Sequence, residues 1–228
     1  MLSKMMNVGS VLIVAPHADD ETLGCGGTIC RLIDMGFEVH WLVVTSMQEP
    51  DFNEAQILKR ESEIKEVSKL YNFKSTILLD YKAATLNSYA QRILINDFYK
   101  ILNTLKPATL FVPFRDDAHS DHRIVFDSII AASKSFRHPY IKNILAYETL
   151  SETEFNLKPG AMKFSPNFFV DITKYLEKKI LTLQKFESEI SIFPFPRSSR
   201  SVKSLADLRG VQINCEAAEA FMLLKGVL

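Results

Sequence analysis

Residues 10–27 have the sequence SVLIVAPHADDETLGCGG, which joins a short apolar run to an acidic loop and a glycine cluster. The apolar part, residues 10–14, is typical of a parallel strand that is buried on both faces. One imidazole and three carboxylates follow within residues 17–21. Open α/β sheets bind their ligands at the carboxyl ends of the strands. The loop after this strand is therefore a candidate functional site.

A second polar cluster, His119-Ser120-Asp121-His122, follows another apolar run at residues 108–113. Two His/Asp clusters at two strand ends look like one metal site that is divided between distant parts of the chain. Metals of the zinc type bind imidazole nitrogen and carboxylate oxygen, commonly through three protein ligands in a catalytic site. His17 and Asp20 could supply two ligands, and a histidine of the second cluster could supply the third. The pattern therefore favours a metal-dependent hydrolase.

The remaining residues of the two clusters suggest further roles. Adjacent carboxylates usually point in different directions, so Asp20 can bind the metal while Asp19 faces a water that the metal activates, as a general base does. One imidazole of the second cluster can bind the metal while the other faces the substrate, and Asp121 could orient a ring. The glycines at 24, 26 and 27 permit close approach of a substrate and tight packing of a helix on a strand.

The rest of the chain alternates apolar runs with amphipathic stretches. Strands are expected at 38–45, 76–79, 108–113, 143–147 and 167–172, and helices at 23–35, 54–71, 91–105, from 121 onward, and at 174–187, 202–208 and 216–224. Such alternation predicts an α/β fold with a mostly parallel sheet and helices on both faces. No break in composition marks a domain boundary, so a single domain over residues 1–228 is expected.

The composition excludes several classes of protein. The chain has 228 residues, and its 27 basic residues balance 27 acidic ones, so no overall field favours nucleic acid or an anionic membrane. Three scattered cysteines suggest a reducing compartment without a disulfide framework. Residues 1–9 lack the apolar core of a signal peptide, and no apolar run is long enough to span a bilayer. A cytoplasmic protein is therefore expected.

Residues 16–27 closely resemble the His-Pro-Asp-Asp-Glu signature of the LmbE-like, PIG-L-type de-N-acetylases, and residues 119–122 resemble the second signature, His-x-Asp-His. The resemblance implies a Rossmann-like three-layer sandwich and the zinc-dependent removal of acetyl groups from N-acetylglucosamine-type sugars. Carried over by motif position, it implies that His17, Asp20 and His122 bind zinc. Ala18 stands where the family usually has proline, but no ligand is lost by this difference.

The same resemblance implies roles for four further residues. Asp19 would be the general base, and His119, oriented by Asp121, would stabilise the oxyanion or protonate the leaving amine. Arg60, in Arg60-x-x-Glu63, resembles a family arginine that contacts the substrate. The expected partner is an N-acetylated sugar substrate, and assembly into homo-oligomers is common among the relatives. The loops at 46–53 and 80–90 match nothing that would identify the sugar.

Two alternatives stay open at this stage. The first is a Rossmann-like nucleotide-binding enzyme with residues 24–27 under a phosphate, although Gly-x-Gly-Gly is not the dinucleotide fingerprint and the neighbouring acids would repel phosphate. The second is a non-enzymatic module that binds a metal or a partner. Pure ligation of a metal would require neither Asp19 nor His119, so their presence favours the enzyme.

Some of these residues also have simpler explanations. Arg60 lies among charged helix residues, where solvated charge is the usual reason for an arginine. Arg197 and Arg200 could contact an anion or simply keep a loop soluble. Cys25 lies among the glycines, where packing of a small residue explains it better than nucleophilic catalysis.

Overall fold

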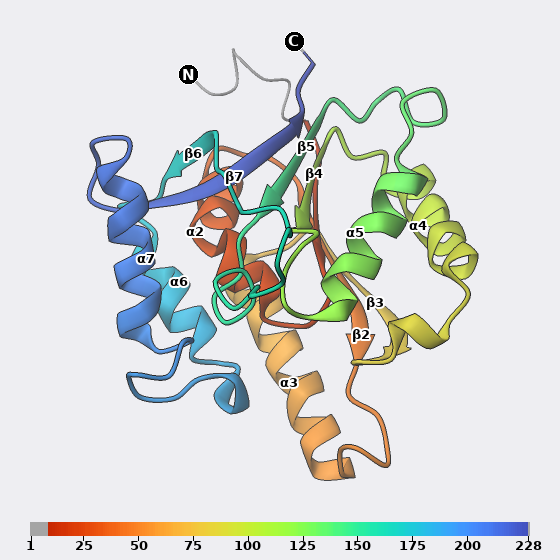
Figure 1. The fold of residues 1–228 in the computed structure, drawn as a ribbon, viewed down its shortest axis with the longest axis horizontal. Helices are drawn as coiled ribbons and strands as arrows, with labels where there is room; N and C mark the ends of the chain where they lie inside the picture. Colours follow the sequence, from red (N-terminus) through yellow and green to blue (C-terminus); the bar gives the residue numbers. More distant parts are fainter. Residues whose placement is uncertain (1–8, 228) are drawn as a thin grey trace.

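In the computed structural model, which describes residues 9–227, one sheet has helices on both faces (Figure 1). The strands are β1 (Val11–Ala15), β2 (Val39–Ser46), β3 (Ser75–Lys82), β4 (Thr109–Pro113), β5 (Asn143–Tyr147), β6 (Phe168–Asp171) and β7 (Ala218–Lys225). The helices are α2 (Asp20–Asp34), α3 (Glu54–Tyr71), α4 (Gln91–Leu105), α5 (Ser120–Ala132), α6 (Leu176–Leu183) and α7 (Ser199–Val211), with short 3₁₀ turns η1 (Leu86–Ser88) and η2 (Glu187–Glu189).

The strand order is β3-β2-β1-β4-β5-β7-β6, and the first five strands are parallel. Among the strands of residues 9–227, only β7 runs antiparallel to its two neighbours. This arrangement confirms the predicted α/β fold with a mostly parallel sheet. The chain leaves β1 toward β2 on one side and later returns to β4 on the other side, so the strand order reverses between β1 and β4. Such a switch point opens a crevice at the carboxyl ends of the two strands.

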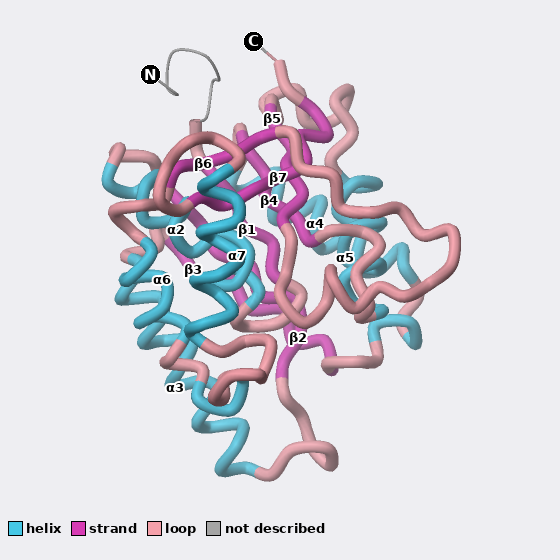
Figure 2. Tube along the Cα trace, turned by 60° about the vertical axis from the view of Figure 1, so that its left-hand side comes forward, coloured by secondary structure: helices cyan, strands magenta, loops and turns pink. Residues whose placement is uncertain are grey.

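Two apolar layers cover the sheet, and β1 contributes to both. Val11, Ile13 and Ala15 face one cluster, which α2, α3, α6 and α7 complete. Leu12 and Val14 face the other cluster, which α4 and α5 complete. Figure 2 shows α2, α6 and α7 stacked on one side of the strands with α4 and α5 beyond them. The apolar run at residues 11–15 is thus buried on both faces, as expected for a central parallel strand.

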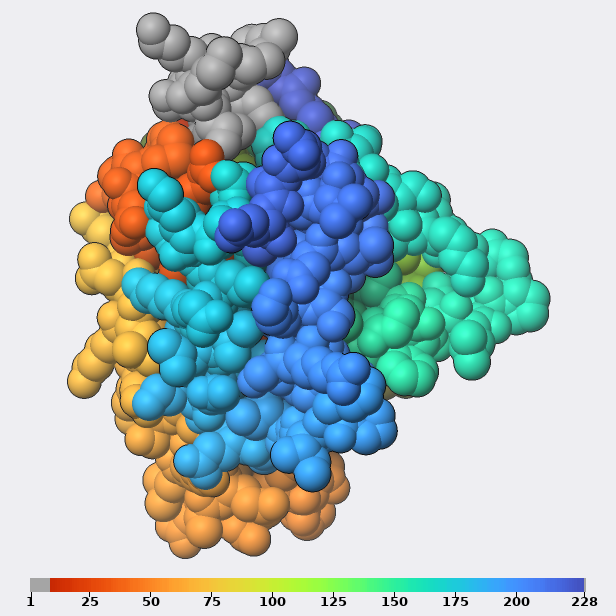
Figure 3. Space-filling view, turned by 90° about the vertical axis from the view of Figure 1, so that its left-hand side faces the viewer, coloured from red at the N-terminus to blue at the C-terminus, as the bar shows by residue number. Residues whose placement is uncertain are grey.

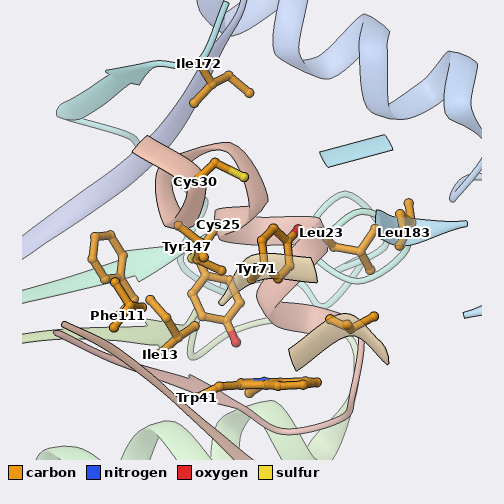
Figure 4. Packing of buried hydrophobic residues seen from close by; sticks show 14 of the residues in the cluster. Ile13, Leu23, Cys25, Cys30, Trp41, Tyr71, Phe111, Tyr147, Ile172 and Leu183 are labelled. Atoms are coloured by element: carbon orange, nitrogen blue, oxygen red, sulfur yellow. The ribbon is translucent and has the colours of Figure 1, made fainter. Parts of the chain in front are cut away.

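The glycines of α2 serve the packing of this helix on the sheet. A Cβ atom on Gly24 would lie 2.3 Å from Cδ2 of Tyr147, whose hydroxyl donates to the carbonyl of Val14 at 2.8 Å. A Cβ atom on Gly27 would lie 2.6 Å from the side chain of Ile172. Both neighbours belong to the apolar layer around α2 (Figure 4). Of the two roles considered for these glycines, close helix packing is the one that the structure supports.

The prediction of a helix at residues 216–224 is wrong, because residues 218–225 form β7. Ala, Glu, Met and Leu favour a helix in isolation. In the structure, however, this segment lies between β5 and β6 and forms backbone hydrogen bonds with both strands. The carboxylate of Glu219 accepts from the backbone N–H groups of Gly27 and Thr28 at 2.9 and 2.7 Å and from Lys179 Nζ at 2.7 Å. Tertiary contacts therefore override the local propensity.

Two predictions about targeting have different outcomes. The prediction that no signal peptide is present concerns residues 1–9, of which residues 1–8 lie outside the described part of the chain. Among residues 9–227, none of the helices has both the length and the apolar character that a membrane crossing requires.

Candidate active site

The two polar clusters meet at the carboxyl ends of β1 and β4, which are neighbours in the sheet. His17 lies in the loop after β1, and Asp20 begins α2. His119 caps α5, whose first turn carries Asp121 and His122. His17 Nε2 lies 3.3 Å from Asp121 Oδ2, although 104 residues separate them in the chain. The structure therefore brings together the candidate residues of both clusters.

Three side chains offer ligand atoms to one point. Asp20 Oδ2 lies 3.3 Å from His17 Nδ1 and 3.4 Å from His122 Nε2, and one ligand atom from each residue lies within 4.8 Å of the others. Atoms that bind one tetrahedral zinc at about 2.0–2.2 Å are separated by about 3.3–3.6 Å. His122 Nε2 is buried and has no hydrogen-bond partner. The spacing and this unpartnered nitrogen fit a bound metal ion.

Each of these imidazoles is held from behind by a carboxylate. Asp117 Oδ2 lies 2.7 Å from His122 Nδ1, and Thr153 Oγ1 donates to the other oxygen of Asp117 at 2.6 Å. Asp121 Oδ2 holds His17 Nε2 in the same way. A proton on each far nitrogen leaves the near nitrogen free as a metal ligand. The sequence analysis missed Asp117, whose only signal was its place between β4 and the second cluster.

Asp121 therefore contacts a different histidine from the one expected. Its carboxylate lies against His17 and also accepts from the backbone N–H groups of Ala84 and Leu86 at 2.7 and 3.3 Å. Its hydrogen bond to His119 comes from the backbone, because the N–H of Asp121 donates to His119 Nδ1 at 3.1 Å, while a carboxylate oxygen of Asp121 lies within 4.8 Å of a ring nitrogen of His119. The acceptor role of Nδ1 places the proton of a neutral His119 on Nε2.

The electrostatics of the metal group follow from this geometry. Burial opposes ionisation of Asp20, but the imidazoles of His122 and His17 hold its pKa well below the usual range. Burial also disfavours a charged His17, yet its contacts with Asp121 and Asp20 raise its pKa to about 9. Burial and the charge of His17 lower the pKa of His119 to about 4. Without a metal, the positive charge of the site is thus concentrated on the rings beside Asp20.

Asp19 lies next to this group in an unusual backbone conformation. Its φ of 146° is rare for a residue with a side chain and costs about 1–3 kcal/mol. The backbone N–H of Asp19 donates to Glu21 Oε2 at 3.1 Å, and its carbonyl accepts from the N–H groups of Thr22 and Leu23. These hydrogen bonds to the first turn of α2 therefore hold the backbone of Asp19 in its strained conformation. Burial, followed by the charge of Asp20, raises the pKa of Asp19 to about 7.

An arginine from the C-terminal part of the chain contacts Asp19. Arg197 Nη1 lies 2.8 Å from Asp19 Oδ2 and 2.8 Å from Glu189 Oε2, while its Nε donates to Ser151 Oγ at 2.8 Å. From the sequence, Arg197 could either contact an anion or keep a loop soluble. Arg200, for which the sequence left the same two roles open, lies over the ring of Phe193, with Cζ 4.1 Å from the ring centroid.

Arg60 is buried and holds the first loop in place. Its guanidinium donates to the carbonyl of Ala18 at 3.1 Å, to Glu63 at 3.0 Å and also to Glu189. Figure 3 shows the segment around residues 185–200 lying beside α3, from which Arg60 projects. Arg60 also lines the active-site cavity, so its contact with a substrate stays a prediction.

A cavity of about 770 Å³ opens beside the two clusters. Its polar end is lined by His17, Asp19, Asp20, His119, Glu152 and Arg197. Glu152 Oε2 accepts from the backbone N–H of His119 at 2.9 Å, a contact that the sequence did not reveal. The site can therefore hold a metal, a buried carboxylate base and a hydrogen-bond donor around one small-molecule pocket.

The family model of the PIG-L proteins, described as GlcNAc-PI de-N-acetylase, matches residues 12–133, which contain both clusters. The chain belongs to the PIG-L family. Membership confirms the predicted enzyme class, a hydrolase that acts on an amide C–N bond. The PIG-L deacetylases depend on a metal, and His17, Asp20 and His122 form a group that could hold one.

Individual relatives agree with the PIG-L assignment. Diacetylchitobiose deacetylase of Thermococcus kodakarensis is 26% identical over 191 residues, which cover 80% of this chain and 71% of the relative. A probable N-acetyl-alpha-D-glucosaminyl L-malate deacetylase 2 of Bacillus anthracis is 24% identical, with coverage of 82% and 84%. The solved structure of N,N'-diacetylchitobiose deacetylase from Pyrococcus horikoshii has a TM-score of 0.77 at 24% identity, covers 95% of this chain and 84% of its own, and shares the fold.

Proposed function

We propose that this PIG-L protein is a zinc-dependent hydrolase that removes the acetyl group from an N-acetylglucosamine-type sugar or glycoconjugate. The observation that carries the proposal is the buried, unpartnered Nε2 of His122, which faces Asp20 Oδ2 at 3.4 Å within reach of His17. The named activities of the two curated relatives support an N-acetylated sugar as the substrate.

In this proposal, His17, Asp20 and His122 hold the metal. Two imidazoles and one carboxylate are a typical set for catalytic zinc, which keeps a further position open. Zinc in such a site lowers the pKa of a coordinated water to about 7 and polarises a carbonyl oxygen. Asp117 and Asp121 keep the two imidazoles in the tautomers that ligation requires.

Asp19 accepts the proton of the attacking water. A general base works best when its pKa lies near the operating pH, and burial raises the pKa of Asp19 toward that range. Arg197 holds Oδ2 of Asp19, which leaves Oδ1 to take the proton. The same proton then passes to the amine nitrogen as the C–N bond breaks. The products are acetate and the free amino sugar.

His119 donates a hydrogen bond to the oxyanion. Its Nδ1 already accepts from the backbone of Asp121, so the neutral ring presents Nε2–H. Burial lowers the pKa of His119, and a neutral ring favours oxyanion stabilisation over protonation of the amine. Of the two roles considered for His119, we therefore propose the first.

The test is a mass-spectrometric screen of zinc-loaded protein against N-acetylated saccharides, with the loss of one acetyl group as the readout. Asp19→Asn should bind zinc at the wild-type stoichiometry and lose turnover. Asp207→Asn, on the exposed surface of α7, is the matched control and should keep full activity. Full turnover by zinc-loaded Asp19→Asn would overturn the assignment of the base.

The two alternatives have less support. Tyr147 and Ile172 cover the positions at Gly24 and Gly27 where a phosphate would have to approach, which argues against a nucleotide site. A non-enzymatic module would show zinc binding without turnover on every N-acetyl sugar.

The proposal also includes a single domain, since one sheet joins residues 11–225. It includes a cytoplasmic location as well, since Cys25, Cys30 and Cys215 are unpaired.

A further inference from the structure

Part of the active-site cavity is lined by apolar side chains that the hydrolytic chemistry does not use. Five side chains form this part, which we call the apolar trough: Met47, Phe52, Ile57, Ile64 and Leu78. They come from the loop after β2, from α3 and from β3. The trough belongs to the same cavity as Asp19 and His119, so a molecule bound at the metal can extend into it.

The trough exists because only the C-terminal half of α3 packs fully on the sheet. The buried apolar residues of α3 are Ile64, Val67 and Tyr71, all in that half. Ile57 lies two helical turns before Ile64 on the same face and is only partly buried. The facing strand β3 also leaves an apolar side chain open, because Leu78 is 54% exposed. Apolar side chains of α3 and β3 thus line the cavity, beside Glu61 and Asp80 of the same two elements.

The charges around the cavity disfavour an anionic substrate. The acidic residues of its lining are Asp19, Asp20, Glu49, Glu61, Asp80, Glu152 and Glu189. The cationic side chains described in the lining are Arg60, Arg197 and, in the metal-free site, His17, and both guanidinium groups already contact Glu189. Even with a divalent metal bound, the formal negative charges of this lining exceed its positive ones, and a phosphate or carboxylate that paired with either arginine would have to displace an existing ion pair.

We propose that the apolar trough binds the apolar aglycone of an uncharged N-acetylglucosaminide, an alkyl or aryl group attached to the sugar. The inference rests on the proposed deacetylase function and specifies its substrate. Ligand sites combine apolar walls with a few polar groups that fix orientation, and this cavity combines the trough with the polar groups of the metal site. Burial of the aglycone supplies binding energy that can be used to hold the acetyl group at the reacting centre.

The test compares kcat/KM for three substrates of the zinc-loaded enzyme: the hexyl glycoside of N-acetylglucosamine, free N-acetylglucosamine, and uridine diphosphate N-acetylglucosamine. We expect at least a tenfold preference for the hexyl glycoside over the free sugar, and the lowest value for the nucleotide sugar. Leu78→Ser and Ile57→Ser should each reduce the ratio of hexyl glycoside to free sugar at least fivefold. Leu58→Ser, an exposed leucine beside Ile57 that does not line the cavity, should leave the ratio unchanged.

Three results would overturn the inference: equal kcat/KM for the hexyl glycoside and the free sugar, preference for the nucleotide sugar, or an unchanged ratio in both trough variants. Failure of the proposed function would look different, because none of the three compounds would then lose acetate. In that event, calorimetric titration of the wild type with the hexyl glycoside decides the matter. Binding that Leu78→Ser weakens would support the trough, and absence of binding would refute it.

Discussion

Asp117→Asn should weaken metal binding without removing a ligand. Asp117 is fully buried, and its carboxylate lies 2.7 Å from Nδ1 of His122 and accepts from Thr153 at 2.6 Å. The substitution keeps the volume of the side chain but removes its charge and one of its two acceptor oxygens. His122 therefore loses the carboxylate that holds its proton on Nδ1 and makes Nε2 a good ligand.

The size of the effect depends on how the new amide settles. If the amide oxygen faces His122, the ring keeps its tautomer but loses a charged partner. If the amide nitrogen faces His122 instead, the proton moves to Nε2, where the metal should bind. Loss of such a partner typically weakens metal affinity about 10- to 100-fold. That range corresponds to about 1.4–2.8 kcal/mol of binding free energy.

The assay is a competitive titration of zinc against a chromophoric chelator, on protein whose folding is verified by urea denaturation. Asp116→Asn is the matched control, because the carboxylate of Asp116 contacts Arg115 and the backbone N–H of Met162 rather than a histidine. The control should bind zinc as the wild type does. A zinc affinity of folded Asp117→Asn within threefold of the wild type would refute the assigned role of Asp117.

Three further predictions concern the base, the pH dependence and the packing of α2. Arg197→Ala should reduce kcat at least tenfold at unchanged zinc stoichiometry, because Asp19 loses the partner that orients it, and added guanidinium should restore part of the rate. Burial raises the pKa of Glu21 from 4.5 to about 8, so the folded protein binds a proton that the unfolded chain releases in that interval. The unfolding free energy of the wild type should therefore fall as the pH rises from 5 to 8. In Glu21→Gln it should fall less, and the difference between the two proteins should reach up to a few kcal/mol, at about 1.4 kcal/mol per pKa unit. Gly24→Ala should cost about 1–3 kcal/mol or more of unfolding free energy in urea, because a methyl group would overlap the ring of Tyr147.

Each of these predictions has a result that contradicts it. Wild-type kcat in Arg197→Ala would show that Asp19 needs no partner. Parallel pH profiles of the wild type and Glu21→Gln would show that Glu21 is ionised in the folded protein. Equal stability of Gly24→Ala and the control Gly226→Ala, where only the side chain of Leu223 is near, would show that α2 can move away from the sheet.

Much of the architecture could be predicted from sequence because local periodicity carries it. The apolar run at residues 11–15 has no polar side, and a strand of this kind has to be buried on both faces. The repeated change from such runs to amphipathic helices predicted the parallel sheet. The two clusters could be assigned to one site because both follow strands, and parallel strands end at the same edge of a sheet.

The prediction of β7 as a helix shows the limit of local pattern. The segment from Ala218 to Lys225 consists largely of good helix formers, and nothing within it reveals the two strand edges that receive it. Glu219 in this strand also accepts hydrogen bonds from the backbone of Gly27 and Thr28, almost 200 residues earlier in the chain. A contact between such distant segments produces no periodic pattern in either segment, so it cannot be predicted from local sequence.

By itself, the sequence determined the fold class and the family, and it indicated His17, Asp20 and His122 as candidate metal ligands, because each motif follows a strand in the chain. Only the tertiary structure decided which carboxylate holds which imidazole: Asp117 behind His122 and Asp121 behind His17. It also decided that Arg197, 178 residues after Asp19, contacts the carboxylate of Asp19, the proposed base. Hydrogen bonds and ion pairs depend on the distance between atoms, and the spacing of residues along a chain does not specify that distance.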